Sequence, residues 1–396
     1  MQPLFLTHAA VATSAGIGMD ASHSALVEMR SGLAPCAFEN AALDCYAGQI
    51  PDHLLTPVPD NLAEFDCRNN RLAQLGLRQN GFEQAVRVAK EKYGAHRVGV
   101  FMGTSTSGIL ETENAYRRRS PDGELPKDFH YATTHNTYSL AWFVQSYFGL
   151  NGPVSAISTA CSSSAKTFGN AARMIAAGVC DAAVVGGVDS LCLTTLYGFS
   201  SLGLLSTSAC RPFDEARDGI SIGEGAAMVL LEKQAAPGSD EPVALLGVGE
   251  SSDAYHMSSP HPEGLGARTA MERALRSAGL ESSDIDYVNL HGTGTRANDA
   301  AEDKAVCAVL GEGVPCSSTK GWTGHTLGAC GSIEAVFCAL AITKGLMPGS
   351  VNTREVDPTM KLNYLRENRQ APVRVAMSNA FGFGGTNCSL VLGRPR

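Results

Sequence analysis

One cysteine and two histidines stand in sequence surroundings that suit covalent chemistry. Cys161 lies in the stretch ISTACSSSAKTFGNAARM, directly after a strand-like segment and directly before a predicted helix. A thiol at the start of a helix lies near free amide N–H groups and the positive end of the helix dipole, which lowers its pKa and favours the nucleophilic thiolate. We therefore expect Cys161 to be a nucleophile, and the alternative is a small buried residue that fills a tight turn.

The two histidines lie in glycine- and threonine-rich turns that follow strand-like segments. His291 stands in NLHGTGTRANDAAE, and His325 stands in STKGWTGHTLGACGS. Neighbouring glycines let the backbone approach a substrate closely. Either histidine alone fits a structural role, but a cysteine at a helix start together with two such histidines indicates acyl-transfer or thioester chemistry.

The composition is that of a compact, enzyme-like chain. Of the 396 residues, 44% are hydrophobic, 18% are charged and 42 are glycine, which favours a heavily buried body over a disordered or fibrous chain. The 31 basic and 39 acidic residues give a net charge of −8. This balance offers no support for a nucleic acid or an anionic membrane surface as the partner, and we expect neither.

The cysteines and the apolar runs predict a cytoplasmic protein without a bound metal. The 12 cysteines form no short regular framework, so we expect reduced thiols rather than disulfides. No CxxC pair typical of a zinc site is present, and we expect no metal. No signal segment opens the sequence, and no apolar run approaches the roughly 18 residues that cross a membrane, which predicts a soluble, cytoplasmic location.

Strand-like and helix-like segments alternate along the chain, which predicts a largely parallel α/β core. Two of the predicted helices, 164–177 and 332–343, carry almost no charge on any face, and such helices are normally buried. The strand-like segments are 97–103, 181–187, 226–232, 286–292 and 388–393, and the helix-like segments are 67–94, 164–178, 266–279 and 331–345.

Two segments far apart in the sequence share the same order of predicted structural elements. Residues 153–178 and 314–345 each read as a short strand, a turn rich in serine, threonine and cysteine, and a helix of small residues. This weak internal repeat predicts two similar halves packed face to face, with the two helices between two sheets. The best candidate boundary is the segment Glu232 to Val243, which divides the chain into residues 1–240, carrying the cysteine, and 241–396, carrying both histidines.

Six ordered sequence blocks carry a resemblance to a known enzyme family. The blocks are STACSSSAKTFGNAARMIAAGVCDAAVVGGVDS, RPFDEARDGISIGEGAAMVLLE, SSDAYHMSSPHPEG, HGTGTRANDAAE, SSTKGWTGHTLGACGSIEA and SNAFGFGGTNCSLVLG. In this order they resemble the β-ketoacyl-[acyl carrier protein] synthases, the decarboxylating condensing enzymes of fatty-acid and polyketide pathways. The resemblance implies the thiolase fold, a five-layer αβαβα sandwich of two pseudo-repeated halves.

The resemblance also implies roles for individual residues. Cys161 would take the acyl chain as a thioester, with backbone N–H groups of Cys161 and Phe383 as the oxyanion hole and Phe383 also as a gate to the acyl pocket. His291 and His325 would hydrogen-bond the malonyl thioester oxygen as CO2 leaves. The resemblance gives supporting roles to two further sets of residues: Lys320, Glu302 and Glu334 as a charged network, and Thr293 and Thr295 as the binding site of the pantetheine arm.

No tightly bound cofactor is implied, because phosphopantetheine arrives on the acyl carrier protein. Two departures from the family pattern, Trp322 and the serines directly after Cys161, leave the substrate open. Housekeeping fatty-acid elongation and the synthesis of a polyene or other specialised polyketide-like chain both remain possible.

Three other classes of protein fit the sequence less well than a condensing enzyme. A degradative thiolase shares the fold but places a second catalytic cysteine in a CxG turn, whereas Cys388 and Cys330 stand in other contexts here. A chain-length-factor-like subunit would lack the cysteine nucleophile. A cysteine hydrolase would leave the remaining blocks unexplained.

Local basic clusters and an apolar strand predict protein partners. Carrier proteins are acidic, so basic clusters can steer docking in spite of the negative net charge, and a solvated helix face is the alternative. The resemblance implies a dimer in which the strand beside the cysteine block pairs across a twofold axis, and the apolar stretch NGPVSAIS fits such an interface. The dimer is either a homodimer or a heterodimer with a paralogous, cysteine-less subunit of the chain-length-factor type. The predicted docking residues are Arg68, Arg71, Arg117, Arg118, Arg119 and Lys127.

Overall fold

The computed structural model describes residues 1–236, 238 and 241–395, and its centre is a 12-stranded sheet in which 11 strands form one continuous path. The first half of the path is β6 (Val154–Ile157), β5 (Val98–Gly103), β7 (Ala182–Asp189), β9 (Gly225–Glu232) and β1 (Leu4–Thr13). The second half is β10 (Ala244–Ser252), β17 (Thr386–Gly393), β16 (Val375–Gly382), β11 (Tyr287–Asn289), β12 (Pro315–Ser317) and β14 (Asn363–Tyr364). The short β2 (Gly16–Ile17) pairs with β1.

The two halves repeat the same strand pairing. In the first half β5 is parallel to β6 and β7, while β9 is antiparallel to β7 and β1. In the second half β11 is parallel to β12 and β16, while β17 is antiparallel to β16 and β10. The halves join where Leu4 and Phe5 of β1 pair with Leu245 and Ala244 of β10. The repeat expected from the two similar segments is therefore present in the strand order.

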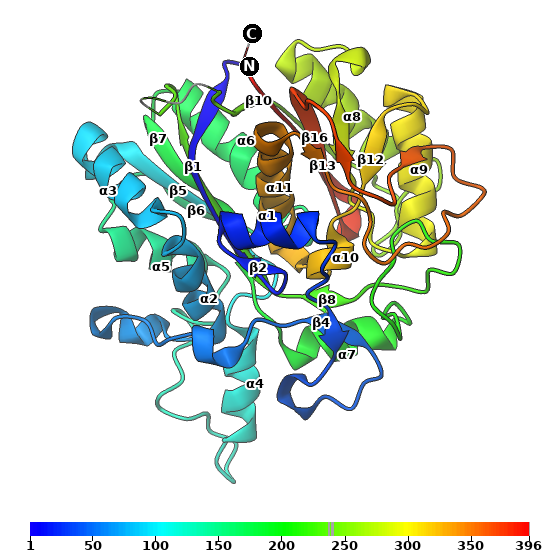
Figure 1. Ribbon diagram of the computed structural model, residues 1–396. Coiled ribbons are helices and arrows are strands. Elements are labelled where there is room, and N and C mark those ends of the chain that lie inside the picture. The colour runs from blue at the N-terminus through cyan, green and yellow to red at the C-terminus, as the bar shows by residue number, and fades with distance from the viewer. Residues whose placement is uncertain (237, 239–240, 396) are drawn as a thin grey trace.

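The helices complete five layers (Figure 1). The outer helices of the first half are α2 (Arg68–Leu77), α3 (Phe82–Tyr93) and α5 (Tyr138–Phe148), and those of the second half are α8 (Leu265–Ala278) and α9 (Arg296–Leu310). Between the two parts of the sheet lie α6 (Ser163–Ala176) and α11 (Cys330–Lys344), which contact each other. The αβαβα sandwich of the thiolase fold is confirmed. The predicted boundary at residue 240 falls partly on residues 237 and 239–240, outside the described residues, and stays a prediction.

The central pair of helices explains why the sequence there is poor in charge. Every residue of α11 from Cys330 to Ile342 is buried. The two helices approach so closely that a Cβ atom on Gly331 would lie 2.6 Å from that of Ala165, and the N–H of Ser332 donates to Ser164 Oγ at 2.9 Å. Helix α6 is less completely buried than predicted, because Arg173 reaches solvent and binds Glu250.

One helix is long and apolar enough to cross a membrane by length and composition alone. This segment, Leu327–Lys344, contains α11, and 89% of it is buried inside the protein. A helix that is apolar on all sides fits either a membrane or the centre of a large protein. Here neighbouring strands and α6 surround the helix, so it is a core helix.

A buried carboxylate fastens the outer helix α2 to the strands beside the site. Glu224 has no exposed side-chain surface, and it accepts hydrogen bonds from the backbone N–H groups of Ile50 and Leu191 at 2.9 and 3.0 Å. Its counter-charge is Arg68, 2.5 Å away and 11% exposed. Glu224 lies one residue beyond β8 (Ile222–Gly223). The backbone of β8 is hydrogen-bonded to that of His325.

Loss of this ion pair tests its structural role. We expect R68A to lower the free energy of unfolding by about 3–5 kcal/mol, because it leaves a buried carboxylate without a partner. R71A removes a neighbouring arginine whose ion pair with Asp66 is partly exposed, and it is the matched control with an expected loss of about 0–1 kcal/mol. Urea unfolding followed by circular dichroism measures both, and equal losses would contradict the role given to Arg68.

Candidate active site

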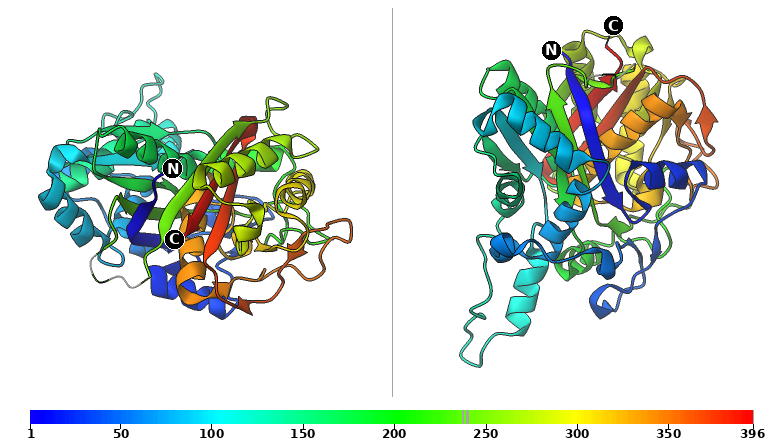
Figure 2. Two further views of the ribbon diagram at one scale, coloured as in Figure 1. Left: turned by 90° about the horizontal axis from the view of Figure 1, so that it is seen from above. Right: turned by 60° about the vertical axis from the view of Figure 1, so that its left-hand side comes forward.

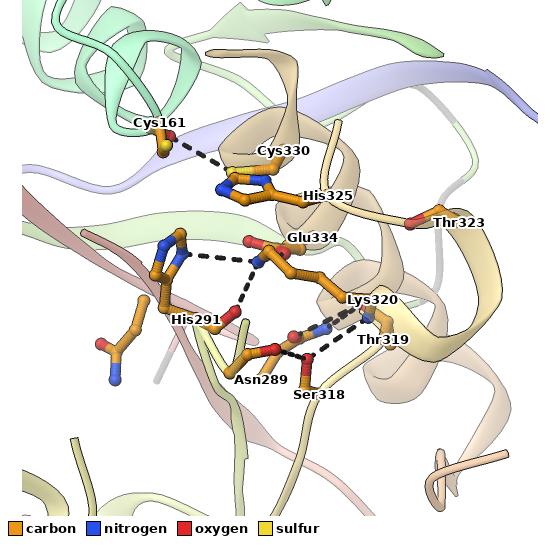
Figure 3. Close-up of polar contacts among 12 residues, drawn as sticks. Cys161, Asn289, His291, Ser318, Thr319, Lys320, Thr323, His325, Cys330 and Glu334 are labelled. Atoms are coloured by element: carbon orange, nitrogen blue, oxygen red, sulfur yellow. Dashed lines mark hydrogen bonds and ion pairs between the residues drawn. The ribbon is translucent and has the colours of Figure 1, made fainter. Parts of the chain in front are cut away.

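Cys161, His291 and His325 meet at one cavity of about 340 Å³. Cys161 follows β6 and precedes α6, His291 follows β11, and His325 follows α10 (Lys320–Thr323). The cysteine sulphur and a ring nitrogen of each histidine lie within 4.8 Å of one another, and Figure 3 shows the three side chains together. Three residues separated by up to 164 positions in the sequence therefore form one cluster, as the sequence predicted.

The serines around Cys161 hold a strained turn. Ala160 has a φ of +52°, in the left-handed region that non-glycine residues rarely adopt. Its carbonyl oxygen accepts hydrogen bonds from Ser105 Oγ at 3.1 Å and Ser163 Oγ at 2.5 Å, and Ser163 Oγ accepts one from the N–H of Thr159 at 2.9 Å. Ser163, one of the serines that depart from the family pattern, thus fixes the backbone directly before Cys161.

Burial decides the protonation state of Cys161. The residue is 5% exposed, and this burial raises the pKa of its thiol to about 11, although the charge of Lys320 and the backbone N–H of Phe383 act to lower it. The expectation of a lowered pKa was therefore wrong. The helix start was predicted correctly, since α6 begins at Ser163, but it does not outweigh the loss of water around the sulphur.

Both histidines are neutral hydrogen-bond donors toward the cavity. Burial, followed by the charge of Lys320, lowers the pKa of His291 and of His325 well below 6.5. Lys320 Nζ lies 3.4 Å from His291 Nδ1, and the N–H of Leu327 donates to His325 Nδ1 at 3.3 Å. Because each Nδ1 accepts a hydrogen bond, the ring proton of each histidine resides on Nε2.

The same tautomers argue against a metal at this cluster. Cys161, His291 and His325 are close enough to share an ion, as are His291, Cys330 and Glu334. However, a ring nitrogen that carries a proton has no free lone pair for a metal, and the adjacent ammonium group of Lys320 repels a cation. In the second group burial holds the pKa of the Cys330 thiol well above 9, and Glu334 is already paired with Lys320.

The predicted supporting residues surround the histidines in two separate arrangements. Lys320 donates to Glu334 and to the carbonyl oxygen of His291, each at 2.5 Å (Figure 3). Glu302 accepts the N–H groups of His291 and Gly292, each at 2.8 Å. Burial raises the pKa of both glutamates to about 7. The hydrogen bonds that Glu302 accepts and the charge of Lys320 beside Glu334 act in the opposite direction, but burial outweighs them.

Two further residues of this arrangement escaped the sequence analysis. Asn379 Nδ2 donates to Glu302 at 3.2 Å, and Ser318 Oγ donates to the carbonyl oxygen of Gly292 at 2.7 Å. Both fix the turn that follows β11. The only signal in the sequence was their position inside the blocks SNAFGFGGTN and SSTKGWTGH, where polar residues precede the glycines.

The residues expected to bind the pantetheine arm and to gate the pocket also line the cavity. Thr293 and Thr295 lie on its wall, with their hydroxyl groups 2.9 Å apart. The backbone N–H of Phe383 lies close enough to the Cys161 sulphur to act on the pKa of the thiol, which places this donor beside the carbonyl group that the sulphur would attack. The Phe383 ring packs against Phe199 with 5.7 Å between the ring centroids, so the gate has a partner that the sequence did not indicate.

The residues expected to dock a carrier protein have unequal surroundings. Arg68 is not a free surface charge, since its guanidinium group is held by Glu224 and Asp52, and this corrects the expectation for that residue. Arg71 is partly exposed and paired with Asp66. The other four, Arg117, Arg118, Arg119 and Lys127, are exposed.

These four cations belong to one projecting part of the molecule. They lie at the end of α4 (Ile109–Arg117) and in the loop after it, which extends away from the body of the protein (Figure 2). Arg117 pairs with Glu39 and Arg118 pairs with Asp128, and all four side chains of these pairs are at least 38% exposed. A partner can therefore reach them.

Trp322 affects packing rather than the substrate pocket. It is fully buried, and its indole N–H donates to the carbonyl oxygen of Ala25 in α1 (Met19–Val27) at 3.2 Å. It does not line the cavity of Cys161. The departure from the family pattern at this position therefore fixes α10 against α1 and says little about the substrate.

Comparisons with known proteins agree with this geometry. Residues 72–236 match the family described as "Beta-ketoacyl synthase, N-terminal domain", and residues 243–354 match "Beta-ketoacyl synthase, C-terminal domain". The chain is 34% identical over 397 residues to 3-oxoacyl-[acyl-carrier-protein] synthase 2 of Vibrio harveyi, covering 95% of this chain and 94% of that protein. It is 37% identical over 304 residues to Nodulation protein E of Rhizobium meliloti (strain 1021), covering 75% of each.

Solved structures give the same result. The ketosynthase ApeO of Xenorhabdus doucetiae, in complex with its chain length factor ApeC, superposes with a TM-score of 0.90 and 37% identity, covering 100% of this chain and 98% of that one. The similarity extends over the whole chain and includes both halves of the sandwich. This protein therefore belongs to the β-ketoacyl synthase family.

Proposed function

We propose that this protein joins an acyl group held on Cys161 to malonyl-acyl carrier protein by decarboxylative Claisen condensation, which gives a 3-oxoacyl-acyl carrier protein. The observation that carries the proposal is the buried cluster in which one thiol lies beside two neutral Nε2–H donors. Such a cluster supplies both a nucleophile for acyl transfer and fixed donors for an enolate oxygen.

The first stage is a thiol–thioester exchange. The Cys161 sulphur attacks the carbonyl carbon of the incoming thioester, and the N–H groups of Phe383 and Cys161 hold the oxyanion. The bond to the pantetheine sulphur then breaks, and the proton of the Cys161 thiol passes to that leaving sulphur. No net charge is created, which suits a site whose burial keeps the thiol protonated at rest.

The second stage uses the histidines. The malonyl group loses CO2, and the electron pair of the broken C–C bond moves into an enolate whose oxygen accepts hydrogen bonds from Nε2–H of His291 and His325. The enolate carbon attacks the acyl thioester, the bond to Cys161 breaks, and the sulphur regains a proton from solvent. The two donors are fixed before reaction, so stabilising the enolate needs no reorganisation.

The positions of the other cysteines favour this reaction over a thiolase reaction. A thiolase needs a second catalytic cysteine at the site, and Cys388 is fully buried inside β17, away from the cavity. Cys330 donates its thiol proton to the carbonyl oxygen of Cys161. Among the described residues Cys161 is the one cysteine that lines the cavity.

We propose two protein partners, an acyl carrier protein and a second subunit of the same fold. The edge of the first half of the sheet supports the second subunit, because all four residues of β6 are partly exposed and no strand covers them in the described structure. The nearby Tyr138 and Trp142 of α5 are exposed as well. The subunit is another copy of this chain or a chain-length-factor-like paralogue, as in the complex of ApeO with ApeC.

We further propose that the enzyme is cytoplasmic and holds no tightly bound cofactor, since phosphopantetheine arrives on the carrier protein. Its pathway is fatty-acid elongation or the synthesis of a specialised polyene or polyketide chain. The relatives include a 3-oxoacyl-[acyl-carrier-protein] synthase, which supports the first pathway, and a ketosynthase with a chain length factor, which supports the second.

The reaction and its substrate range can be measured together. We expect the purified protein, incubated with acyl carrier proteins of varied chain length and unsaturation and with malonyl carrier protein, to form 3-oxoacyl products two carbons longer than the acyl donor. Mass spectrometry of the carrier proteins identifies these 3-oxoacyl products. If no donor is extended, either alone or with a co-expressed paralogue, the proposed function is wrong.

Substitutions separate the two stages. C161Q should abolish condensation but retain decarboxylation of malonyl carrier protein, because the amide imitates the shape of a bound thioester while both histidines remain. H291A and H325A should each lower CO2 release by about 100-fold, since one preorganised donor contributes roughly 3 kcal/mol, and should still permit acylation of Cys161. CO2 release and acyl-enzyme mass report the two stages.

The exposed His53, which lies outside the cavity, gives the matched control H53A. It should match the parent in both measurements. Decarboxylation at the parent rate in H291A or H325A, or its absence in a folded C161Q, would contradict the assignment of roles.

The raised pKa of Cys161 predicts the pH dependence of its alkylation. Because the folded-state pKa lies near 11, the thiol is protonated at pH 7, and the thiolate fraction grows about tenfold per pH unit. The rate of alkylation by iodoacetamide should rise continuously from pH 7 to 9.5, with C161S defining the background. A plateau below pH 8 would show instead that the thiolate is already formed at neutral pH.

A further inference from the structure

With one exception, the charged side chains that line the cavity have an ion-pair or hydrogen-bond partner among the described residues. Arg217 is 3% exposed and forms ion pairs with Asp299 at 3.4 Å and with Asp357 at 2.7 Å. Asp218 lies 3.6 Å from Arg211 and accepts a hydrogen bond from a serine hydroxyl at 2.6 Å. Asp253 has no cation beside it in the described residues, but it accepts hydrogen bonds from Asn387 Nδ2 at 2.9 Å and from the backbone N–H of His261 at 3.3 Å.

The exception is Arg296. It lines the same cavity as Cys161, its side chain is exposed, and it has no hydrogen-bond or ion-pair partner within residues 1–236, 238 and 241–395. A guanidinium group presents five donors in a fork that matches a phosphate or a carboxylate. An arginine that lines the cavity without a partner of its own is therefore available to an anionic part of a ligand.

The backbone around Arg296 also favours an anion. Arg296 is the first residue of the 15-residue helix α9. In its first turn the N–H of Asn298 is capped by Thr295 Oγ1, while the N–H groups of Arg296 and Ala297 have no partner among the described residues. Ala297 and Asn298 of that turn line the cavity, so the positive end of the helix dipole faces the same space. The helix follows Thr293 and Thr295 directly, which places the basic group next to the proposed site of the pantetheine arm.

We propose that Arg296 binds the phosphate group of the phosphopantetheine arm and thereby selects phosphorylated thioester carriers over unphosphorylated ones. The inference rests on the proposed function. The thioester end of the arm must reach Cys161, its neutral amide segment passes Thr293 and Thr295, and its other end carries a phosphate. The cavity has this same polarity, with a thiol and neutral donors at one place and an unpaired cation at another.

Acylation of Cys161 by a graded set of donors tests the proposal. The donors are one acyl group on pantetheine, on phosphopantetheine, on coenzyme A and on an acyl carrier protein, and intact-protein mass spectrometry gives kcat/KM for each. For R296Q we expect a loss of about tenfold or more with the three phosphate-bearing donors and a change within about twofold with acyl-pantetheine. R296K should restore most of the loss, because it keeps the charge.

A control variant and three contrary outcomes complete the test. R276Q removes an exposed arginine of α8 that lies outside the cavity, and it should match the parent with all four donors. Equal losses for pantetheine and phosphopantetheine donors would overturn the proposal, and so would a loss confined to the carrier protein, which would show docking of the protein surface instead. A parent chain that no thioester acylates would overturn the proposed function and this inference with it.

Discussion

The buried ammonium group of Lys320 is the interaction on which the site depends. Burial acts to lower the pKa of Lys320, but the charge and hydrogen bond of Glu334 at 2.5 Å and the charge of Glu302 together help to raise it above its usual value, so the group stays cationic although its side chain is 1% exposed. This cation lowers the pKa of His291 and His325 and occupies His291 Nδ1. It thus adds to the larger effect of burial in keeping both histidines neutral and sets the tautomer of His291, at the cost of burying an ion pair that neither partner could leave without penalty.

The five-layer architecture is what makes such a pair possible. Glu334 stands on α11, which is enclosed by the two parts of the sheet and by α6, and Lys320 stands on the short helix that leads into it. Electrostatic interactions are stronger in this water-free environment than in water. This holds for the attraction between Lys320 and Glu334 and for hydrogen bonds to a developing enolate. The small residues at the contact between α6 and α11 allow this enclosure.

The cavity divides the chemistry between the two halves of the chain. The first half supplies the proposed nucleophile on a turn held by serine hydroxyls, and the second half supplies the proposed donors, the ion pair and Phe383. Each half presents its catalytic turn at the carboxyl end of a parallel strand, β6 for Cys161 and β11 for His291. Such strand ends are where α/β proteins commonly place their ligands.

The sequence by itself determined the class of fold and the residues that we propose to react. Cys161, His291, His325 and the alternation of strands with helices were legible because motif chemistry and periodicity are local properties. The tertiary structure alone decided the raised pKa of Cys161, the structural role of Arg68, the packing role of Trp322 and the unpaired state of Arg296. Glu224 is 156 positions from Arg68 and Ala25 is 297 positions from Trp322. Desolvation and charge pairing depend on what the fold brings close, and no local pattern contains that information.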